Sequence, residues 1–127
     1  MKIEKFEDLE VWQLSRELVK LIYKMSDGMI SPKDYSFINQ IQRSSISIMS
    51  NIAEGFERKG TKEYMHFLYM AKGSCGELRS LLYVALDLSY VNQKQFNEIY
   101  VMAEKISKSL GGLIKYLKSL NLESSNR

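Results

Sequence analysis

The chain has 127 residues, of which 45% are hydrophobic and 26% are charged, and its formal net charge is +3. This composition is that of an ordinary globular domain, and it excludes a disordered or fibrous protein. A chain of this length forms one domain with its own core, and its mild positive charge does not by itself indicate nucleic-acid binding.

Apolar residues recur at helical spacing in four segments, which predicts four amphipathic helices. We expect these helices to cover about 8–27, 32–58, 62–88 and 92–118. A single proline and few turn clusters favour long helices over many short strands. Long helices with short connections fold most simply as an antiparallel up-down-up-down bundle. We therefore predict an all-α four-helix bundle, with one domain over residues 1–127 and a frayed tail at 121–127.

The predicted helix ends carry capping signals. Asp8 can cap the first helix, and Gly28 can end it in a left-handed conformation. Ser31, which precedes a proline, can cap the second helix. Asn92 and Gln95 stand at the spacing of a capping box at the start of the fourth helix.

The second predicted helix has two contrasting faces. One is an apolar core stripe that includes Ile41, Ile48 and Ile52. The other is polar but mostly small and uncharged, which is unusual for a surface that only meets water. Its candidate network residues are Arg43, Ser47, Asn51 and Glu54. Two interpretations stay open: a hydrogen-bond network that fixes the register of helices or subunits, which we favour, and a polar site that lines a channel or contacts a ligand.

The third predicted helix is apolar on most of its sides, so most of its sides must be covered. Tyr69, Tyr83 and Val84 lie outside its core register, and Gly73 and Gly76 make its middle thin. One bundle does not usually cover a helix so fully. We therefore expect a homo-oligomer, with the second and third helices supplying much of the interface.

Groups that carry chemistry are few. The chain has one histidine, His66, and one cysteine, Cys75, whereas a metal site needs three or four ligands. No phosphate-binding glycine pattern occurs, and Glu54 has no second carboxylate or histidine at a matching spacing. We expect no catalytic residues, no metal and no cofactor, and so no enzyme. An enzyme with a site at a subunit interface around Glu54 is a third hypothesis.

Positive charge gathers in a helix-to-helix turn and along the fourth helix. The candidate nucleic-acid contacts are Arg58, Lys59, Lys62, Lys105, Lys108 and Lys115. A lysine stripe is more often a solvated face, and it becomes a binding surface when an oligomer places several copies together. No signal-peptide run and no apolar stretch of 18 residues is present, so we expect a cytoplasmic protein without a membrane partner.

Several motifs resemble a known family. They include the opening Phe6–Gln13, the segment Gln40–Ser45, the segment Ser50–Gly55 and the start of the third helix at Lys62–Tyr64. This pattern is similar to the four-helix-bundle family encoded in intervening sequences of bacterial 23S ribosomal RNA genes. It also resembles the related accessory variability proteins of diversity-generating retroelements. The resemblance covers roughly residues 4–118.

The resemblance implies an antiparallel four-helix bundle, a homopentameric ring and no known enzymatic activity. For the retroelement relatives it implies a basic surface that engages a reverse transcriptase and nucleic acid. Met49 stands where many relatives have proline, so a straighter second helix is expected. The sequence therefore predicts a non-enzymatic homo-oligomer, in which the partner of each chain is another copy of the same chain. The alternative is a nucleic-acid or ribonucleoprotein accessory factor that binds RNA, DNA or a nucleic-acid-processing protein.

Overall fold

The computed structural model describes residues 2–30 and 32–125, with side chains up to residue 121. A short 3-10 helix, η1 (Phe6–Asp8), precedes the α-helices α1 (Glu10–Asp27), α2 (Tyr35–Glu57), α3 (Thr61–Asp87) and α4 (Gln93–Ser125). The described residues form no strand. The predicted all-α class with four helices is thereby confirmed.

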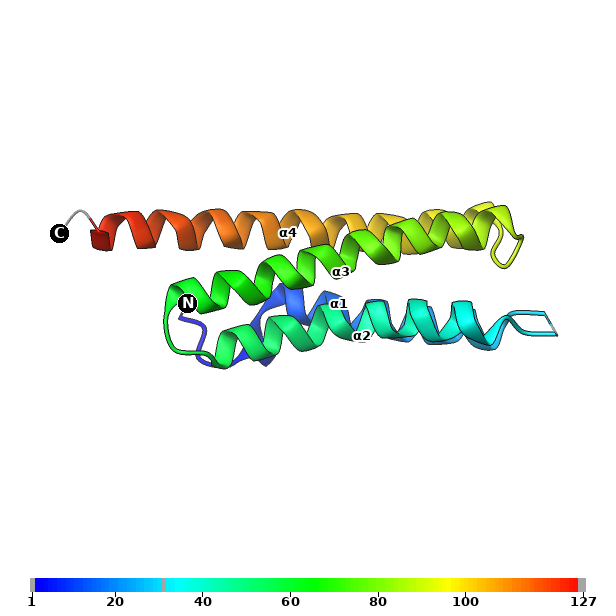
Figure 1. The fold of residues 1–127 in the computed structure, drawn as a ribbon, viewed down its shortest axis with the longest axis horizontal. Helices are drawn as coiled ribbons and strands as arrows, with labels where there is room; N and C mark the ends of the chain where they lie inside the picture. The colour runs from blue at the N-terminus through cyan, green and yellow to red at the C-terminus, as the bar shows by residue number, and fades with distance from the viewer. Residues whose placement is uncertain (1, 31, 126–127) are drawn as a thin grey trace.

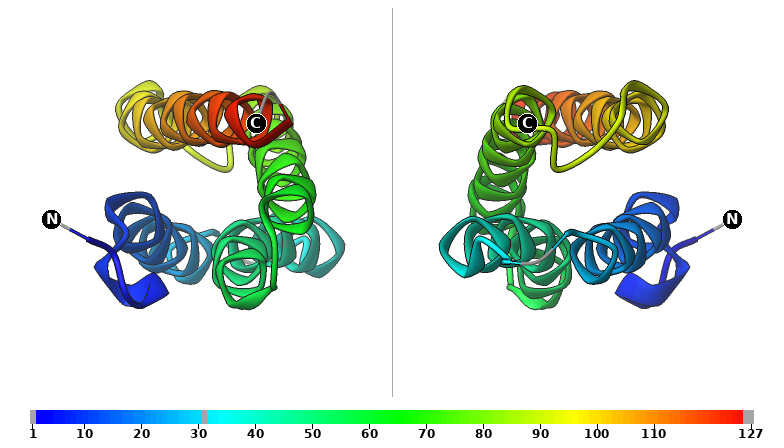
Figure 2. Two further views of the ribbon diagram at one scale, coloured as in Figure 1. Left: turned by 90° about the vertical axis from the view of Figure 1, so that its left-hand side faces the viewer. Right: turned by 90° about the vertical axis from the view of Figure 1, so that its right-hand side faces the viewer.

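The four helices lie along a common long axis (Figure 1). The loops that follow α1 and α3 lie at one end of the molecule, and the loop that follows α2 lies at the other. Viewed end-on, the helices are arranged around a perimeter in chain order (Figure 2). Helix α1 contacts α2 and α4, and α3 contacts the same two helices, while the α1–α4 contact is the least extensive.

The core lies where the apolar stripes of the four helices meet. Its largest fully buried apolar side chains are Leu18, Ile22, Ile41, Ile48, Ile52, Leu68, Leu78, Leu82, Ile106 and Leu110. Cys75 is also buried, and its thiol donates a hydrogen bond to the Ala103 carbonyl at 2.9 Å. Burial raises the pKa of this thiol, so it stays protonated in the core.

Two helices begin at well-formed caps. The Asp34 carboxylate accepts a hydrogen bond from the Phe37 N–H at 3.1 Å and caps α2. At the start of α4, the Gln95 N–H donates to the Asn92 side chain at 2.8 Å, and the Asn92 N–H donates to the Gln95 side chain at 2.9 Å. This reciprocal pair confirms the predicted capping box.

The first helix differs from its prediction at both ends. It begins at Glu10, because the chain turns through η1 and Leu9 is extended, so Asp8 is not its cap. Gly28 has φ −83°, which is right-handed, and its N–H continues the helical pattern to the carbonyls of Lys24 and Met25. The predicted left-handed ending is therefore wrong.

Helices α2 and α4 also differ in extent from the expected ranges. Helix α2 begins at Tyr35, after the Asp34 cap, and the predicted cap Ser31 lies outside the described residues. Helix α4 continues to Ser125, so residues 121–125 are helical where a frayed tail was expected, and 126–127 lie outside the description. Among the described residues, no helix is long and apolar enough to cross a membrane.

Candidate interaction surfaces

Small polar side chains join α2 to α3. The Ser44 hydroxyl donates to the Glu77 carboxylate at 2.7 Å, and the hydroxyls of Ser47 and Ser74 lie 3.0 Å apart. The Asn51 amide donates to the carbonyl and the hydroxyl of Ser47 at 2.9 and 3.0 Å. The Ser44–Glu77 and Ser47–Ser74 contacts form only when the two helices keep one register, whereas the Asn51 bonds stay within α2 and orient Ser47. The two contacts between helices fit the structural interpretation of the polar face.

Gly55 lies where α2 and α3 are in close contact. A Cβ atom at this position would lie 2.6 Å from the Phe67 Cβ and 3.2 Å from the Tyr64 ring. Burial raises the pKa of Tyr64 to about 12, and its ring packs edge-on against Phe56 with centroids 5.9 Å apart. The segment Ser50–Gly55 therefore includes a packing requirement that helical spacing alone does not reveal.

The predicted network residues divide into two groups. Ser47 contacts Ser74 of α3 and accepts a hydrogen bond from Asn51, and both Ser47 and Asn51 are half-buried, whereas Arg43 and Glu54 are exposed. The Arg58 guanidinium forms an ion pair with the Glu54 carboxylate and donates a hydrogen bond to it at 2.9 Å. The Arg58 guanidinium also lies over the Phe67 ring, 4.9 Å from its centroid. Because both charged side chains of the pair are about half exposed, the pair adds little stability.

The outer side of α3 carries a row of exposed large apolar residues. We call the following set the α3 stripe: Tyr69, Met70, Tyr83, Val84 and Leu88. Tyr83 is 50% exposed and Val84 is 40% exposed. Gly73 lies on the same side by helical spacing, and a Cβ there would meet open space. Nothing within the described chain therefore requires a glycine at this position, and its small size leaves room for another helix.

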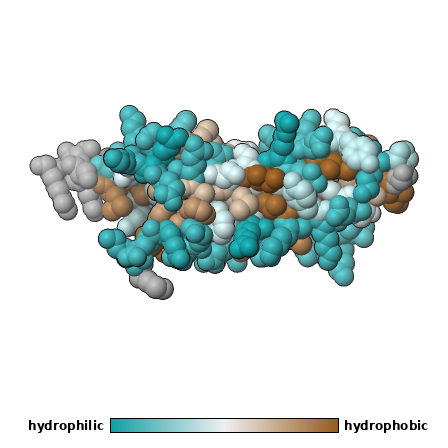
Figure 3. All heavy atoms as spheres, turned by 90° about the horizontal axis from the view of Figure 1, so that it is seen from below, coloured by the Kyte–Doolittle hydropathy of each residue, from teal (hydrophilic) through white to brown (hydrophobic). Residues whose placement is uncertain are grey.

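A second apolar surface lies where α1 and α2 run side by side. Figure 3 looks onto these two helices and shows apolar side chains between hydrophilic margins. By helical spacing, Trp12 and Tyr23 share one side of α1, and Ile46 and Met49 share one side of α2, and we call these four residues the α1–α2 face. Tyr23 and Ile46 are exposed, and Trp12 and Met49 are half-buried. The molecule thus has two apolar surfaces on different helices.

The candidate basic residues occupy two places. Lys59 and Lys62 are exposed at the α2–α3 turn. Lys105, Lys108 and Lys115 are exposed on α4. These three are spaced by three and seven residues, so they lie on the same side of the helix. The C-terminal part of α4 ends near the same end of the bundle as the turn (Figure 1).

Contacts restrain some of these basic groups. Lys108 lies 3.7 Å from Glu104, and Arg58 is held by Glu54. Lys118, which is not among the predicted contacts, lies over the Tyr69 ring, 5.5 Å from its centroid. Lys118 therefore links α4 to the α3 stripe.

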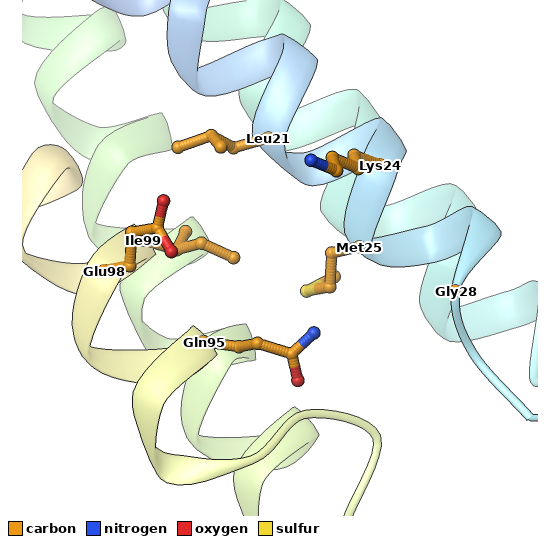
Figure 4. Close-up of a pocket in the computed structure, with 7 residues that line it drawn as sticks. All are labelled: Leu21, Lys24, Met25, Gly28, Gln95, Glu98 and Ile99. Carbon is orange, nitrogen blue, oxygen red and sulfur yellow. The ribbon is translucent and has the colours of Figure 1, made fainter.

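The described residues offer no metal centre, because no group of three or more His, Cys, Asp or Glu is placed to hold an ion. His66 is exposed, and its ring lies edge-on to Phe67 with centroids 5.8 Å apart. A hollow of about 330 Å³ opens between α1 and α4 (Figure 4). It is lined by Leu21, Lys24, Met25, Gly28, Gln95, Glu98 and Ile99. Sequence patterns did not indicate this pocket, because its walls come from opposite ends of the chain.

The similarity to known proteins extends over most of the chain. The family described as 23S rRNA-intervening sequence protein matches residues 7–112. A solved structure from Bacteroides thetaiotaomicron, described as a protein with unknown function from the S23 ribosomal protein family, is 26% identical with a TM-score of 0.76. This similarity covers 83% of the present chain and 98% of the other chain. Comparison with curated proteins returned no match. The chain belongs to the 23S rRNA-intervening sequence protein family.

Proposed function

We propose that this protein acts as a non-enzymatic scaffold that assembles with copies of itself into a ring. Each subunit is an antiparallel up-down-up-down bundle in this proposal, supported by the alternating loop positions and by the contacts between successive helices. The observation that carries the proposal is the exposed α3 stripe. Its large apolar side chains lie on the same side of α3 as Gly73, beside which there is open space. Surfaces of this kind mark interaction sites.

The two apolar surfaces favour a ring over a simple dimer. A two-fold dimer uses one self-complementary surface, whereas contact between two unlike surfaces propagates and gives a ring when the rotation between copies closes, or an open filament when it does not. The α3 stripe and the α1–α2 face lie on different sides of the bundle (Figure 2). We propose five copies because the family resemblance implies a pentamer, and we place the ring in the cytoplasm.

Solution mass tests the assembly directly. Light scattering should give about 74 kDa for five chains of 14.8 kDa, and the mass should not fall on moderate dilution. A mass of one chain at micromolar concentration would contradict the proposal. A stable two-chain or four-chain mass would keep the assembly but exclude the five-fold ring.

A second candidate function is that of a nucleic-acid accessory factor, related to the accessory variability proteins, which binds RNA, DNA or a reverse transcriptase. It is supported by Lys59, Lys62, Lys105 and Lys115, which are exposed and outside any ion pair within the described chain. A ring would repeat these charges around one assembly. RNA affinity should then fall steeply with salt, since each neutralised phosphate releases counterions. A double Lys105→Glu, Lys115→Glu variant should lose binding and keep the mass of the assembly.

The hypothesis of an enzyme around Glu54 has no support from the geometry. That hypothesis places the site at a subunit interface; within one subunit, Glu54 is exposed and its carboxylate is engaged by Arg58, without the enclosed surroundings that tune an acid or base. We expect Glu54→Gln to keep both the fold and the mass of the assembly.

A further inference from the structure

Two adjoining hollows run along the seam between α1 and α4. The first, of about 330 Å³, and the second, of about 400 Å³, share Met25, Gly28 and Gln95 in their walls. The second continues past Tyr90 and Val91 in the loop that joins α3 to α4. Because α1 and α4 make the least extensive helix contact of the bundle, the seam is only partly closed. The first hollow lies at the lower end of the size range of small-ligand pockets, which starts near 300 Å³.

The first hollow combines an apolar wall with two opposite charges. Met25 and Ile99 are buried core residues, and with Leu21 they supply its apolar surface. Lys24 comes from α1 and Glu98 from α4, on opposite sides of the hollow (Figure 4). Within the described chain, neither charge has an ion-pair partner. The Gln95 side chain adds an amide group to the same wall.

We propose that this pocket binds a small zwitterion with an apolar side chain, of the chemical class of a free aliphatic amino acid. The ligand's ammonium group pairs with Glu98, and its carboxylate pairs with Lys24. The aliphatic side chain packs against Met25 and Ile99. Lys24 and Glu98 are both exposed, so each contact contributes modestly. A ligand with only one charge makes only one of the two contacts, so the zwitterion is preferred over its amide and its deaminated acid.

Titration calorimetry on the full chain tests this site with three probes of matched shape. They are L-leucine, L-leucinamide, which lacks the carboxylate, and 4-methylpentanoate, which lacks the ammonium group. Leucine should bind most tightly. Each of the other two should bind about three-fold more weakly, because one contact with an exposed charge is lost.

Two variants assign the charges to the ligand groups. Lys24→Met should weaken leucine binding about three-fold and leave leucinamide binding unchanged. Glu98→Gln should weaken leucine binding similarly and leave 4-methylpentanoate binding unchanged. Lys20→Met and Glu17→Gln are the matched controls, since Lys20 and Glu17 form an exposed pair on α1 outside the pocket lining. Both control variants should bind leucine like the parent chain.

Three results would overturn the proposal. One is the absence of heat with leucine at millimolar concentration. Another is equal affinity for the three probes. The third is leucine binding that survives both pocket variants. The proposal does not depend on the ring, because the pocket shares no residue with the α3 stripe, and a chain that stays monomeric should still bind leucine.

Discussion

Gly55 on α2 and Gly73 on α3 have different surroundings, so substitution by alanine should affect stability differently at the two positions. Gly55 lies where α2 and α3 touch, and a Cβ there would come within 2.6 Å of the Phe67 Cβ. Gly73 faces open space. Gly55→Ala should lower the free energy of unfolding by about 1–3 kcal/mol through overpacking. Gly73→Ala should leave the subunit as stable or raise its stability by up to about 1 kcal/mol, through helix propensity. Chemical denaturation measures both, and equal effects would refute the close contact.

A hydrogen bond across the end of the bundle predicts a pH dependence. The Tyr90 hydroxyl donates to the Asp34 carboxylate at 2.7 Å, which lowers the pKa of Asp34 and raises the pKa of Tyr90. Because the Asp34 pKa is lower in the folded chain, its contribution to stability is present above about pH 4 and is lost as the pH falls. Because the Tyr90 pKa is higher in the folded chain, its contribution is present below about pH 10 and is lost as the pH rises.

Tyr90→Phe is the variant that tests this bond. This variant should raise the Asp34 pKa toward its ordinary value. The Tyr90 hydrogen bond lowers that pKa more than the Phe37 N–H bond does, and the substitution removes it. An NMR titration of the Asp34 carboxyl carbon measures the change. Tyr35→Phe is a suitable control, since Tyr35 is exposed and its hydroxyl makes no hydrogen bond within the described chain. An unchanged Asp34 pKa in Tyr90→Phe would show that the loops are not joined in this way.

At the scale of helices, hydrogen bonds between polar side chains, such as that between Ser44 and Glu77, contribute to the α2–α3 contact. Ser44 is buried and donates to Glu77 at 2.7 Å, so Ser44→Ala should lower the free energy of unfolding by about 1 kcal/mol. A double-mutant cycle with Glu77→Ala should give a coupling energy of about 0.5–1.5 kcal/mol. Ser50→Ala, on the exposed side of α2, should change little. Strict additivity of the two changes would show that this bond does not set the register.

At the scale of the whole molecule, the ring proposal predicts the effect of one charge on the α3 stripe. Val84→Asp should convert the assembly to single chains, because an unpaired carboxylate would be buried at the proposed interface. Its helical circular dichroism should remain, since Val84 is 40% exposed in the subunit. Val101→Asp introduces the same charge on the exposed side of α4 and should keep the mass of the assembly. If Val84→Asp retains the parent mass in light scattering, the α3 stripe is not the interface.

The sequence by itself determined the helices and their buried sides. Ile41, Ile48 and Ile52 recur at the helical period, so they reach the core wherever the neighbouring helices lie. The α4 capping box was also predictable, because its two partners are three residues apart. Local signals failed at Gly28, where the backbone stays right-handed, and at residues 121–125, which continue α4.

Only the tertiary structure decided which residues from distant segments meet. Ser44 reaches Glu77, and Tyr90 reaches Asp34 across 56 positions of sequence. Lys24 and Glu98 share a pocket because α1 and α4 lie side by side. Helical spacing determines which side of a helix a residue occupies. The axial register between two helices is determined by close packing, as at Gly55. The pocket and the contacts between helices therefore followed from the packed bundle, while the core and the exposed residues Tyr69, Tyr83 and Val84 followed from the sequence.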